Sequence, residues 1–407
     1  MSKRGHKLVT SITAVISLII AGSVVTAAYI VPTPAIKPKI TYTNTIAKPV
    51  ALSWPTKGEA AIGADGFGVL AQTASQSVLP TASTAKILTA LIILQKEPLS
   101  LGQSGPTITM TANDVAAYQT YANEGGSVVP VRVGEQISEY KALQAMLLPS
   151  ANNIAQTLAV WAFGSMDNYV NYANKLAETD HLTATHVVDS SGFLPQTVSN
   201  PHDMVLLGEL ALQNPVFTQI VSQPQATIPV AGIVKNVNWL LGKDGIEGIK
   251  TGNTDQAGGC YVFSAPQTIS GHLVTIVGVV MGASNLTNAI NDAIPLLDSA
   301  KPYLKTMTVI TAGQVIGKYT TPWGTSVNAI TSHDVSMLSW DGLSLKPTIK
   351  LNNVQAPYAA GSTVGSLNLT VGNTTSQVSL ILQDKISRPS LSWSLLHVRE
   401  DLSTAYL

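Results

Sequence analysis

Residues 248–281, GIKTGNTDQAGGCYVFSAPQTISGHLVTIVGVVM, contain three β-rich runs separated by turn residues. The runs are Gly248–Thr251, Gly259–Ser264 and Leu273–Met281, and Gly, Asn and Asp lie between them. Short connections of this kind join strands that neighbour each other in an antiparallel sheet. The stretch therefore predicts an antiparallel meander at the centre of the fold.

Residues 51–301 around this stretch predict one α+β domain, in which helices flank an antiparallel sheet. Apolar residues at helical spacing predict helices over Ser83–Lys96, Ser138–Leu148, Asn152–Phe163 and Asn288–Ala300. Asp167 and Asn200 are predicted to cap two more helices. Two short runs between residues 60 and 71 flank Ala64-Asp65-Gly66 and predict a hairpin.

Residues 302–389 contain only strand and turn patterns, which predict a separate small all-β domain. The tail, residues 390–407, fits two structures. Leu391, Trp393 and Leu395 alternate with serines as in a strand, whereas Leu396 and Val398 break this alternation and fit an amphipathic helix equally well.

The N-terminus predicts a location outside the cytoplasm. Basic residues precede an uncharged run, Leu8–Val31, which is longer than the ~7–15 residues of a secretory signal and close to the ~20 of a membrane span. Residues 1–31 are therefore predicted to anchor the chain, with the basic flank inside. The alternative is a signal segment cleaved near residues 26–28, which would release the protein. Residues 32–50 are rich in proline and predict an extended stalk.

The composition excludes several classes of function. The 407 residues carry a formal net charge of +0, and only 11% are charged, so no electrostatic attraction to nucleic acid is expected. Cys260 is the one cysteine, which permits neither an internal disulfide nor a cysteine-based metal site. It is predicted to be an inert thiol buried in a strand. We expect neither a metal nor a cofactor.

Three short peptides carry the candidate chemistry: Ser83-Thr84-Ala85-Lys86, Ser150-Ala151-Asn152 and Lys250-Thr251-Gly252. A serine hydroxyl is a weak nucleophile and needs a base at hydrogen-bond distance. Residues three apart on a helix lie ~5–6 Å apart at Cβ, so Lys86 is predicted to act as the base for Ser83. Burial and the nearby cation Lys250 would lower the pKa of Lys86 toward a useful ~7–8.

The other motif residues suit the handling of a peptide substrate. Ser150 would relay a proton to the leaving group, and Asn152 would hold a substrate amide. Lys250-Thr251-Gly252 would form an edge strand that pairs with the peptide, and its lysine and threonine would receive a carboxylate. The backbone N–H groups of Ser83 and Asn253 are the candidate oxyanion donors.

The order and spacing of the three motifs make the set specific. S-x-x-K also occurs at Ser138–Lys141, where the serine is predicted to be a plain helix cap, and S-x-N recurs at Ser326 and Ser366. K-T-G occurs once. The combination is typical of β-lactamases and penicillin-binding proteins.

The segments LPTASTAKILTALI, VGEQISEYKALQAMLLPSANNIAQTLA and GIEGIKTGNTDQAGGCYVFSA resemble the serine D-alanyl-D-alanine carboxypeptidases, which are the low-molecular-weight penicillin-binding proteins. The resemblance covers roughly residues 60–300. It implies removal of the terminal D-alanine from peptidoglycan stem peptides and acylation by penicillins and other β-lactams. It also implies that Ser83 is the nucleophile, Lys86 the base, and the other two peptides the second and third motifs. The segment AGQVIGKYTTPWG more loosely resembles the β domain that follows the catalytic domain in this family.

Two positions depart from the pattern of that family. Ala151 stands where glycine is common, and neither arginine nor lysine occurs between Lys250 and Lys301, where many relatives place an arginine for the substrate carboxylate. Ser284 or Asn285 would lie near that place. A β-lactamase and a non-catalytic cell-wall-binding protein are the alternative functions. The additional β domain argues against the first, and the intact reactive residues argue against the second.

Overall fold

The computed structural model describes residues 11–20, 22–23, 26, 32–43 and 48–404. The chain forms two compact units. The larger comprises Ala47–Thr306 with Leu338–Leu343, and the smaller comprises the remaining residues. The segment Leu338–Leu343 falls within the predicted domain 302–389 but belongs to the larger unit, because Trp340 is buried in the core of that unit.

The larger unit is built on a five-stranded sheet in the order β10-β11-β12-β2-β3. Every pairing is antiparallel. The strands are β2 (Glu59–Ala64), β3 (Gly68–Gln72), β10 (Gly248–Thr254), β11 (Gly258–Ile269) and β12 (His272–Ala283). The predicted meander and hairpin are both confirmed, and β10 lies at the edge of the sheet, as expected.

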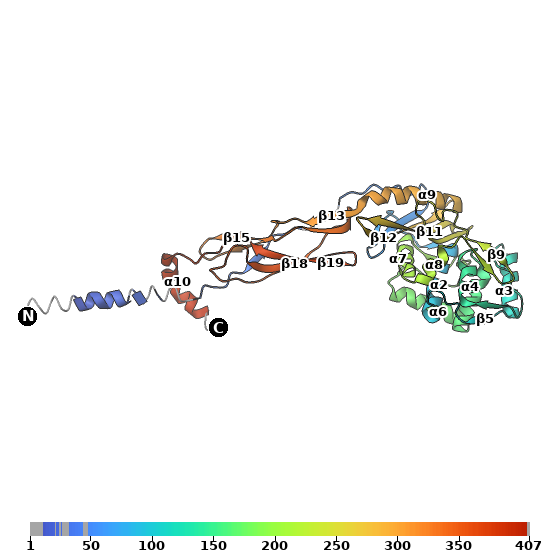
Figure 1. Cartoon of the computed structure of the whole chain (residues 1–407), viewed down its shortest axis with the longest axis horizontal. Coiled ribbons are helices and arrows are strands. Elements are labelled where there is room, and N and C mark those ends of the chain that lie inside the picture. Colours follow the sequence, from blue (N-terminus) through green and yellow to red (C-terminus); the bar gives the residue numbers. More distant parts are fainter. Residues whose placement is uncertain (1–10, 21, 24–25, 27–31, 44–47, 405–407) are drawn as a thin grey trace, which may run out of the picture. The chain divides into compact units, whose positions relative to one another are not determined.

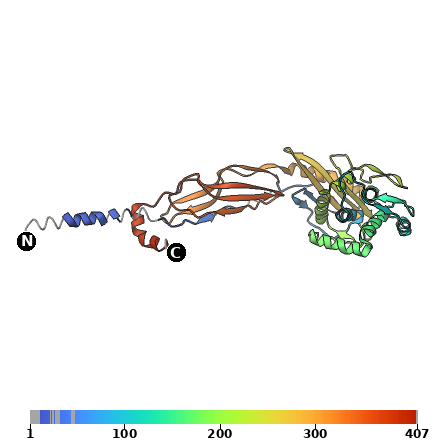
Figure 2. The same cartoon turned by 60° about the horizontal axis from the view of Figure 1, so that its bottom comes forward.

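Both faces of this sheet are buried, because alternate residues of β11 enter two different hydrophobic cores. Tyr261 and Phe263 pack with α9 (Leu286–Ala300), while Cys260 and Val262 pack on the opposite face against the other helices. Figure 1 and Figure 2 show these layers from two directions. Cys260 is fully buried in its strand, as predicted, and burial raises the pKa of its thiol to about 11.

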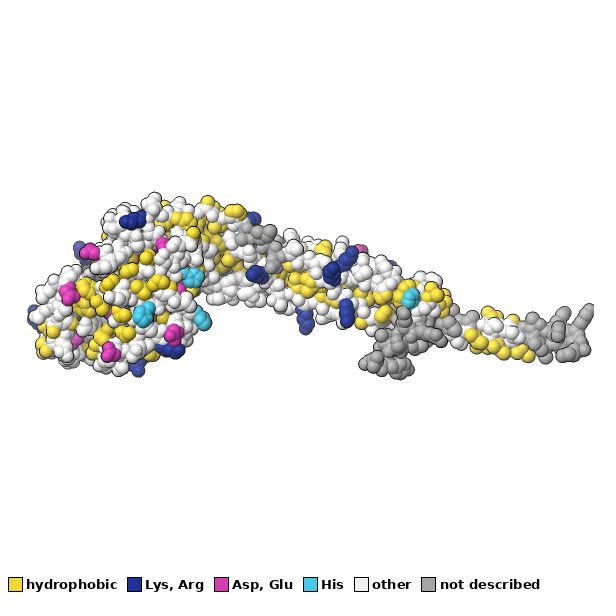
Figure 3. Space-filling view, turned by 180° about the vertical axis from the view of Figure 1, so that it is seen from behind, with side chains coloured by type: hydrophobic (Ala, Val, Ile, Leu, Met, Phe, Trp, Pro, Cys, Tyr) yellow, Lys and Arg dark blue, Asp and Glu magenta, His cyan; other side chains and the backbone are white. Residues whose placement is uncertain are grey.

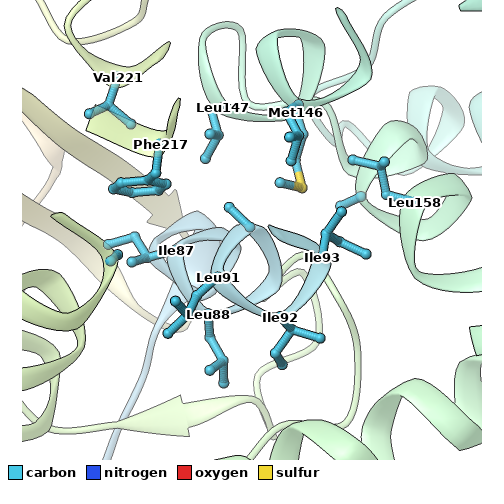
Figure 4. Close-up of a cluster of buried hydrophobic side chains, with 14 of the residues drawn as sticks. Ile87, Leu88, Leu91, Ile92, Ile93, Met146, Leu147, Leu158, Phe217 and Val221 are labelled. Atoms are coloured by element: carbon cyan, nitrogen blue, oxygen red, sulfur yellow. The ribbon is translucent and has the colours of Figure 1, made fainter. Parts of the chain in front are cut away.

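Helix α2 (Lys86–Lys96) occupies the centre of the helical layer. Its apolar side chains point to several sides of the helix and meet residues from three other helices, such as Met146, Leu158 and Phe217 (Figure 4). A helix that is apolar all round is stable only when it is enclosed. The core therefore fixes the position of the turn that precedes α2, which carries Ser83.

The remaining helices of this layer are α3 (Ala112–Asn123), α4 (Glu139–Leu147), α5 (Asn152–Phe163), α6 (Met166–Thr179), α7 (Pro201–Leu212) and α8 (Pro215–Val221). Ser138 and Asn200 cap α4 and α7 as predicted. The predicted cap Asp167 is wrong: the side chain of Ser165 caps α6, and Asp167 lies in its first turn. The shorter Ser side chain sits in extended backbone, as an N-cap requires.

Three short strand pairs connect these helices: β4 (Leu79–Pro80) with β7 (Val198–Ser199), β5 (Thr107–Thr109) with β6 (Gln136–Ser138), and β8 (Gln225–Ile228) with β9 (Gly232–Lys235).

The smaller unit contains a six-stranded antiparallel sheet in the order β1-β14-β15-β19-β18-β17. Its strands are β1 (Pro38–Ile40), β14 (Val315–Thr320), β15 (Ser326–Thr331), β17 (Thr348–Leu351), β18 (Thr363–Val371) and β19 (Thr374–Leu382). A separate pair joins β13 (Leu304–Ile310) to β16 (Val335–Trp340), and the residues of these two strands are divided between the two units. The tail forms helix α10 (Leu391–Thr404), which resolves the choice between strand and helix.

Part of the predicted stalk is instead a strand. Pro38–Ile40 pairs with β14, and the adjacent Ile36 is buried and bridges to Val354. Proline is tolerated here because β1 is an edge strand, where a missing N–H need not break a ladder. The difference arises because pairing with a strand far along the chain leaves no local sequence signal.

The predicted anchor lies partly outside the described residues. Ser11–Ile20 forms a short apolar helix. Among the residues that the structure describes, no single helix is both long enough and apolar enough to cross a membrane. Helices α7 and α8, taken together as a bent pair, reach the required length and apolar composition.

The surface is dominated by uncharged groups. On the face seen in Figure 3, lysine, arginine and acidic side chains are few and scattered, in agreement with the 11% of charged residues. No broad basic face is visible in this view.

Candidate active site

Ser83 lies in a 3-10 turn, Ala82–Ala85, and Lys86 begins α2 directly after it. The predicted helix therefore starts as an α-helix three residues later than expected. The Nζ atom of Lys86 is 2.8 Å from the Oγ atom of Ser83, at hydrogen-bond distance. Ala82, before the serine, has a φ of 46°, a strained value for a residue with a side chain.

Lys86 is fully buried and is held by two further groups. Its Nζ atom donates to the Oδ1 atom of Asn152, at 2.7 Å, and to the carbonyl oxygen of Ser191, at 3.1 Å. These contacts aim the amine at Ser83. In its neutral form the amine can use its lone pair to accept the hydroxyl proton along the 2.8 Å contact.

The pKa of Lys86 is lowered well below its ordinary value. Burial is the largest cause and the positive charge of Lys250 the second, while the carboxylate of Asp189 acts in the opposite direction. Burial also lowers the pKa of Lys250, to about 7. The two buried amines thus hold fewer protons near neutral pH than exposed lysines would.

Strand β10 brings the third motif against the serine turn. A Cβ atom at Gly252 would lie 2.9 Å from the backbone nitrogen of Ser83, so this close approach requires glycine. Next to it, the Nζ atom of Lys250 donates to the carbonyl oxygen of Thr251, at 3.0 Å.

Ser150 occupies an unusual position at the start of the second motif. It has a φ of 70°, is buried, and its Oγ atom has no hydrogen-bond partner among the described residues. A buried hydroxyl without a partner loses its hydration without compensation. Asn152, two residues later, contacts Lys86, but Ser150 makes no such contact.

A pocket of about 450 Å³ opens above the serine, and its lining includes Ser83, Asn152 and Asn253. Glu124 and Asp255 are the charged residues among those that line it in the described structure. The side chain of Asn253 accepts a hydrogen bond from the backbone N–H of Leu286, at 3.2 Å, at the start of α9. The region where Ser284 and Asn285 were expected therefore lies beside the third motif.

The loop Asp189–Thr197 is a part of the site that the sequence analysis missed. The buried carboxylate of Asp189 accepts hydrogen bonds from the backbone N–H groups of Ser191, Gly192 and Phe193, and from the hydroxyls of Ser191 and Thr197. This fixes the Ser191 carbonyl that receives Lys86. The sequence Asp-Ser-Ser-Gly is a common turn pattern, which was the available signal.

Gly192 in this loop also packs against the serine turn. Its φ is +69°, and a Cβ atom there would lie within 1.8 Å of the carbonyl oxygen of Ala82. The serine turn is thus contacted by two glycines, one from β10 and one from this loop. Within the described residues, no group of three or more His, Cys, Asp or Glu side chains is arranged to hold a metal ion.

Comparisons with known proteins agree with this geometry. The family model described as D-alanyl-D-alanine carboxypeptidase (Peptidase_S11) matches residues 56–285. The carboxypeptidase DacB2 of Mycobacterium tuberculosis is 33% identical over 208 residues, which are 49% of this chain and 67% of that protein. DacF of Bacillus subtilis is 27% identical over 330 residues, covering 78% of this chain and 82% of the relative.

The fold of this chain also resembles those of solved structures of penicillin-binding proteins and DD-peptidases. Penicillin binding protein 5 from Haemophilus influenzae matches with a TM-score of 0.60 and 21% identity, covering 84% of this chain and all of that one. The Streptomyces K15 DD-transpeptidase matches with a TM-score of 0.52 over 63% of this chain and 98% of that one. Because the family model covers more than half of the 407 residues, the chain belongs to the D-alanyl-D-alanine carboxypeptidase family and is a serine hydrolase of that type.

Proposed function

We propose that this chain removes the terminal D-alanine from peptidoglycan stem peptides through an acyl-enzyme on Ser83, outside the cytoplasm. The observation that carries the proposal is the 2.8 Å contact between Ser83 and the fully buried amine of Lys86, whose pKa is lowered by burial and by Lys250. A lowered pKa favours the neutral form of the amine, which can act as a base, and its position gives it access to the hydroxyl proton.

In acylation, neutral Lys86 takes the proton of Ser83, and the Oγ atom attacks the carbonyl carbon of the penultimate D-alanine. The negative charge that develops on the carbonyl oxygen is stabilised by the backbone N–H groups of Ser83 and Asn253. The C–N bond then breaks. The proton that Lys86 took passes through Ser150 to the nitrogen of the leaving D-alanine, which returns Lys86 to its neutral form. The Ser150 hydroxyl is buried and has no hydrogen-bond partner among the described residues.

In deacylation, water attacks the ester carbonyl and Lys86 accepts a proton from that water. The ester C–O bond breaks, Lys86 passes this proton to the Oγ atom of Ser83, and the shortened peptide leaves as a carboxylate after the new acid gives its proton to solvent. A penicillin would acylate Ser83 in the same way, with cleavage of the β-lactam C–N bond. Its leaving nitrogen remains tethered to the acyl group, so the adduct persists.

The carboxylate of the departing D-alanine is assigned to Lys250 and Thr251 on β10. Support comes from the edge position of this strand and from the absence of an arginine or lysine between Lys250 and Lys301. We further propose that residues 1–31 anchor the protein to the cytoplasmic membrane, which their basic flank and apolar run support.

Mass spectrometry of a pentapeptide ending in D-Ala-D-Ala tests the function. The wild type should release one alanine, and Ser83→Ala should release none, because the nucleophile is absent. A fluorescent penicillin should label the wild type and not the variant. Absence of both reactions in the wild type would favour a binding protein, and rapid release of hydrolysed penicillin would favour a β-lactamase.

A further inference from the structure

Two cavities continue the catalytic pocket along the helical layer. The second cavity, of about 400 Å³, shares Glu124, Phe193 and Leu194 with the catalytic pocket. The third, of about 490 Å³, shares Asn113 and Gln156 with the second. Because neighbouring cavities share lining residues, the three adjoin one another in a row, and we call the path from Asn152 in the catalytic pocket through the second and third cavities the α3–α5 groove.

Helices α3 and α5 form the walls of this groove and run in opposite directions. The backbone N–H of Asn152, at the start of α5, donates to the carbonyl oxygen of Ser127, four residues after the end of α3, at 2.7 Å. Near the other end, the hydroxyl of Thr157 donates to the carboxylate of Asp114, in the first turn of α3, at 2.6 Å. The groove therefore follows both helices away from Ser83.

One face of α5 sets the length of the groove. Asn152 lines the catalytic pocket, Gln156 the second and third cavities, and Val160 the third. These residues are four apart and share one face of the helix. At about 1.5 Å per residue the eight residues span roughly 12 Å. An extended peptide rises about 3.3 Å per residue, so the groove holds roughly four residues.

The lining of the groove suits a peptide backbone. Thr120, Asn113 and Gln156 offer neutral hydroxyl and amide groups, which can donate to and accept from peptide groups. The carboxylate of Asp114 is already engaged by Thr111 and Thr157. Glu124 is exposed and lies where the first and second cavities meet, so its charge is placed to attract an ammonium group.

We propose that the α3–α5 groove binds the acyl-side part of the stem peptide as an extended chain of about four residues, with an ammonium-bearing side chain beside Glu124. The proposal rests on the proposed function and adds a substrate preference to it. The departing D-alanine is assigned to β10, and the end of β10 together with Asp255 and Gln256 forms one wall of the catalytic pocket. The groove opens from the opposite wall of the catalytic pocket, at Glu124. This position leaves the groove free for the acyl-side part of the substrate.

The test compares two substrates with the full-length chain. One is an N-acetylated tripeptide and the other a pentapeptide with a free side-chain amine at its third residue, both ending in D-Ala-D-Ala. The wild type should show a kcat/KM at least about tenfold higher for the pentapeptide, because remote contacts contribute to transition-state binding. Thr120→Trp should fill the groove and bring this ratio close to one. Glu124→Gln should abolish the preference for the free amine over its acetylated form.

The matched control is Gln119→Trp, an exposed neighbour of Thr120 that does not line the cavities. It should leave the ratio unchanged. Labelling by a fluorescent penicillin reports whether each variant is folded, and Ala116→Trp, on the same wall, replaces Thr120→Trp if that variant is not.

Three results would overturn the proposal. The first is a ratio near one in the wild type, and the second is a ratio that neither tryptophan variant changes. The third is a preference that appears only when the peptide is attached to a glycan strand, which would assign the groove to a saccharide. A wild type that cleaves the tripeptide but shows no preference refutes this inference alone, whereas one that cleaves neither peptide refutes the proposed function and the inference with it.

Discussion

Strand β10 and the loop Asp189–Thr197 both contact the serine turn, and they act on Lys86 with opposite charge. The strand carries Lys250, which lowers the pKa of Lys86, and the loop carries Asp189, which raises it. Each also contacts the turn through a glycine, which is Gly252 in the strand and Gly192 in the loop. The comparison teaches that the pKa of Lys86 is set by a balance, in which burial and a cation outweigh a carboxylate.

Disrupting the contact between the loop and the serine turn should have the largest effect on stability and activity. Gly192→Ala would place a Cβ atom into the carbonyl of Ala82 and would add a strained positive φ. We expect a loss of about 3 kcal/mol or more in the free energy of unfolding, together with the loss of penicillin labelling. Thermal and urea unfolding measure the first effect, and gel fluorescence measures the second.

Gly164→Ala is the control for this prediction. Gly164 ends α5 with a similar φ of 78° but has open space around it, so only the backbone term of about 1 kcal/mol should appear. Equal losses in the two variants would mean that the Ala82 contact does not matter.

Removing the cation on the strand side should shift the pH profile upward. In Lys250→Gln, the neighbouring positive charge no longer lowers the pKa of Lys86, so neutral Lys86 forms only at higher pH. The acidic limb of kcat/KM, which reports the free enzyme's base, should move to higher pH, and the rate at pH 7 should fall about 100-fold.

Lys250→Arg retains the positive charge at this position. Its acidic limb should therefore stay close to that of the wild type, even if the rate falls. A limb that moves equally in both variants would contradict the electrostatic role of Lys250.

Removing the charge on the loop side should have a smaller effect of the opposite sign. In Asp189→Asn, the carboxylate no longer raises the pKa of Lys86, so the acidic limb should move to lower pH. The amide also cannot accept all the hydrogen bonds that the carboxylate receives, so we expect kcat/KM at its optimum to fall about tenfold.

Thr197→Val removes one of those hydrogen bonds and retains the charge of Asp189. Its rate should fall, but its acidic limb should not move. An upward shift of the limb in Asp189→Asn would show that loop disorder, and not charge, dominates.

The same two regions show what sequence patterns can predict. The sheet around β10 was predictable because strands joined by short connections pair with each other. The candidate site was predictable because K-T-G and S-x-x-K have fixed spacing. The proximity of Ser83 and Lys86 follows from three residues of helical spacing, although the turn itself is a 3-10 helix. The family comparison confirms the fold and the type of enzyme that this pattern indicates.

The loop was not predictable, because its order comes from one buried carboxylate that binds several backbone groups, an arrangement without any period. The same reason explains the error over the predicted stalk. The pairing of Pro38–Ile40 depends on residues far along the chain, and a proline-rich segment alone favours an extended spacer.

The position of β1 near the start of the chain also determines the order in which the two sheets can form during synthesis. Its partner β14 emerges from the ribosome some 275 residues later, after every strand of the five-stranded sheet has been made. All strands of the five-stranded sheet are therefore made before β14, whereas the six-stranded sheet cannot be completed until β14 pairs with β1. Until β14 has been made, the early segment Pro38–Ile40 lacks its strand partner, and an unpaired strand edge of this kind favours aggregation of the unfinished chain.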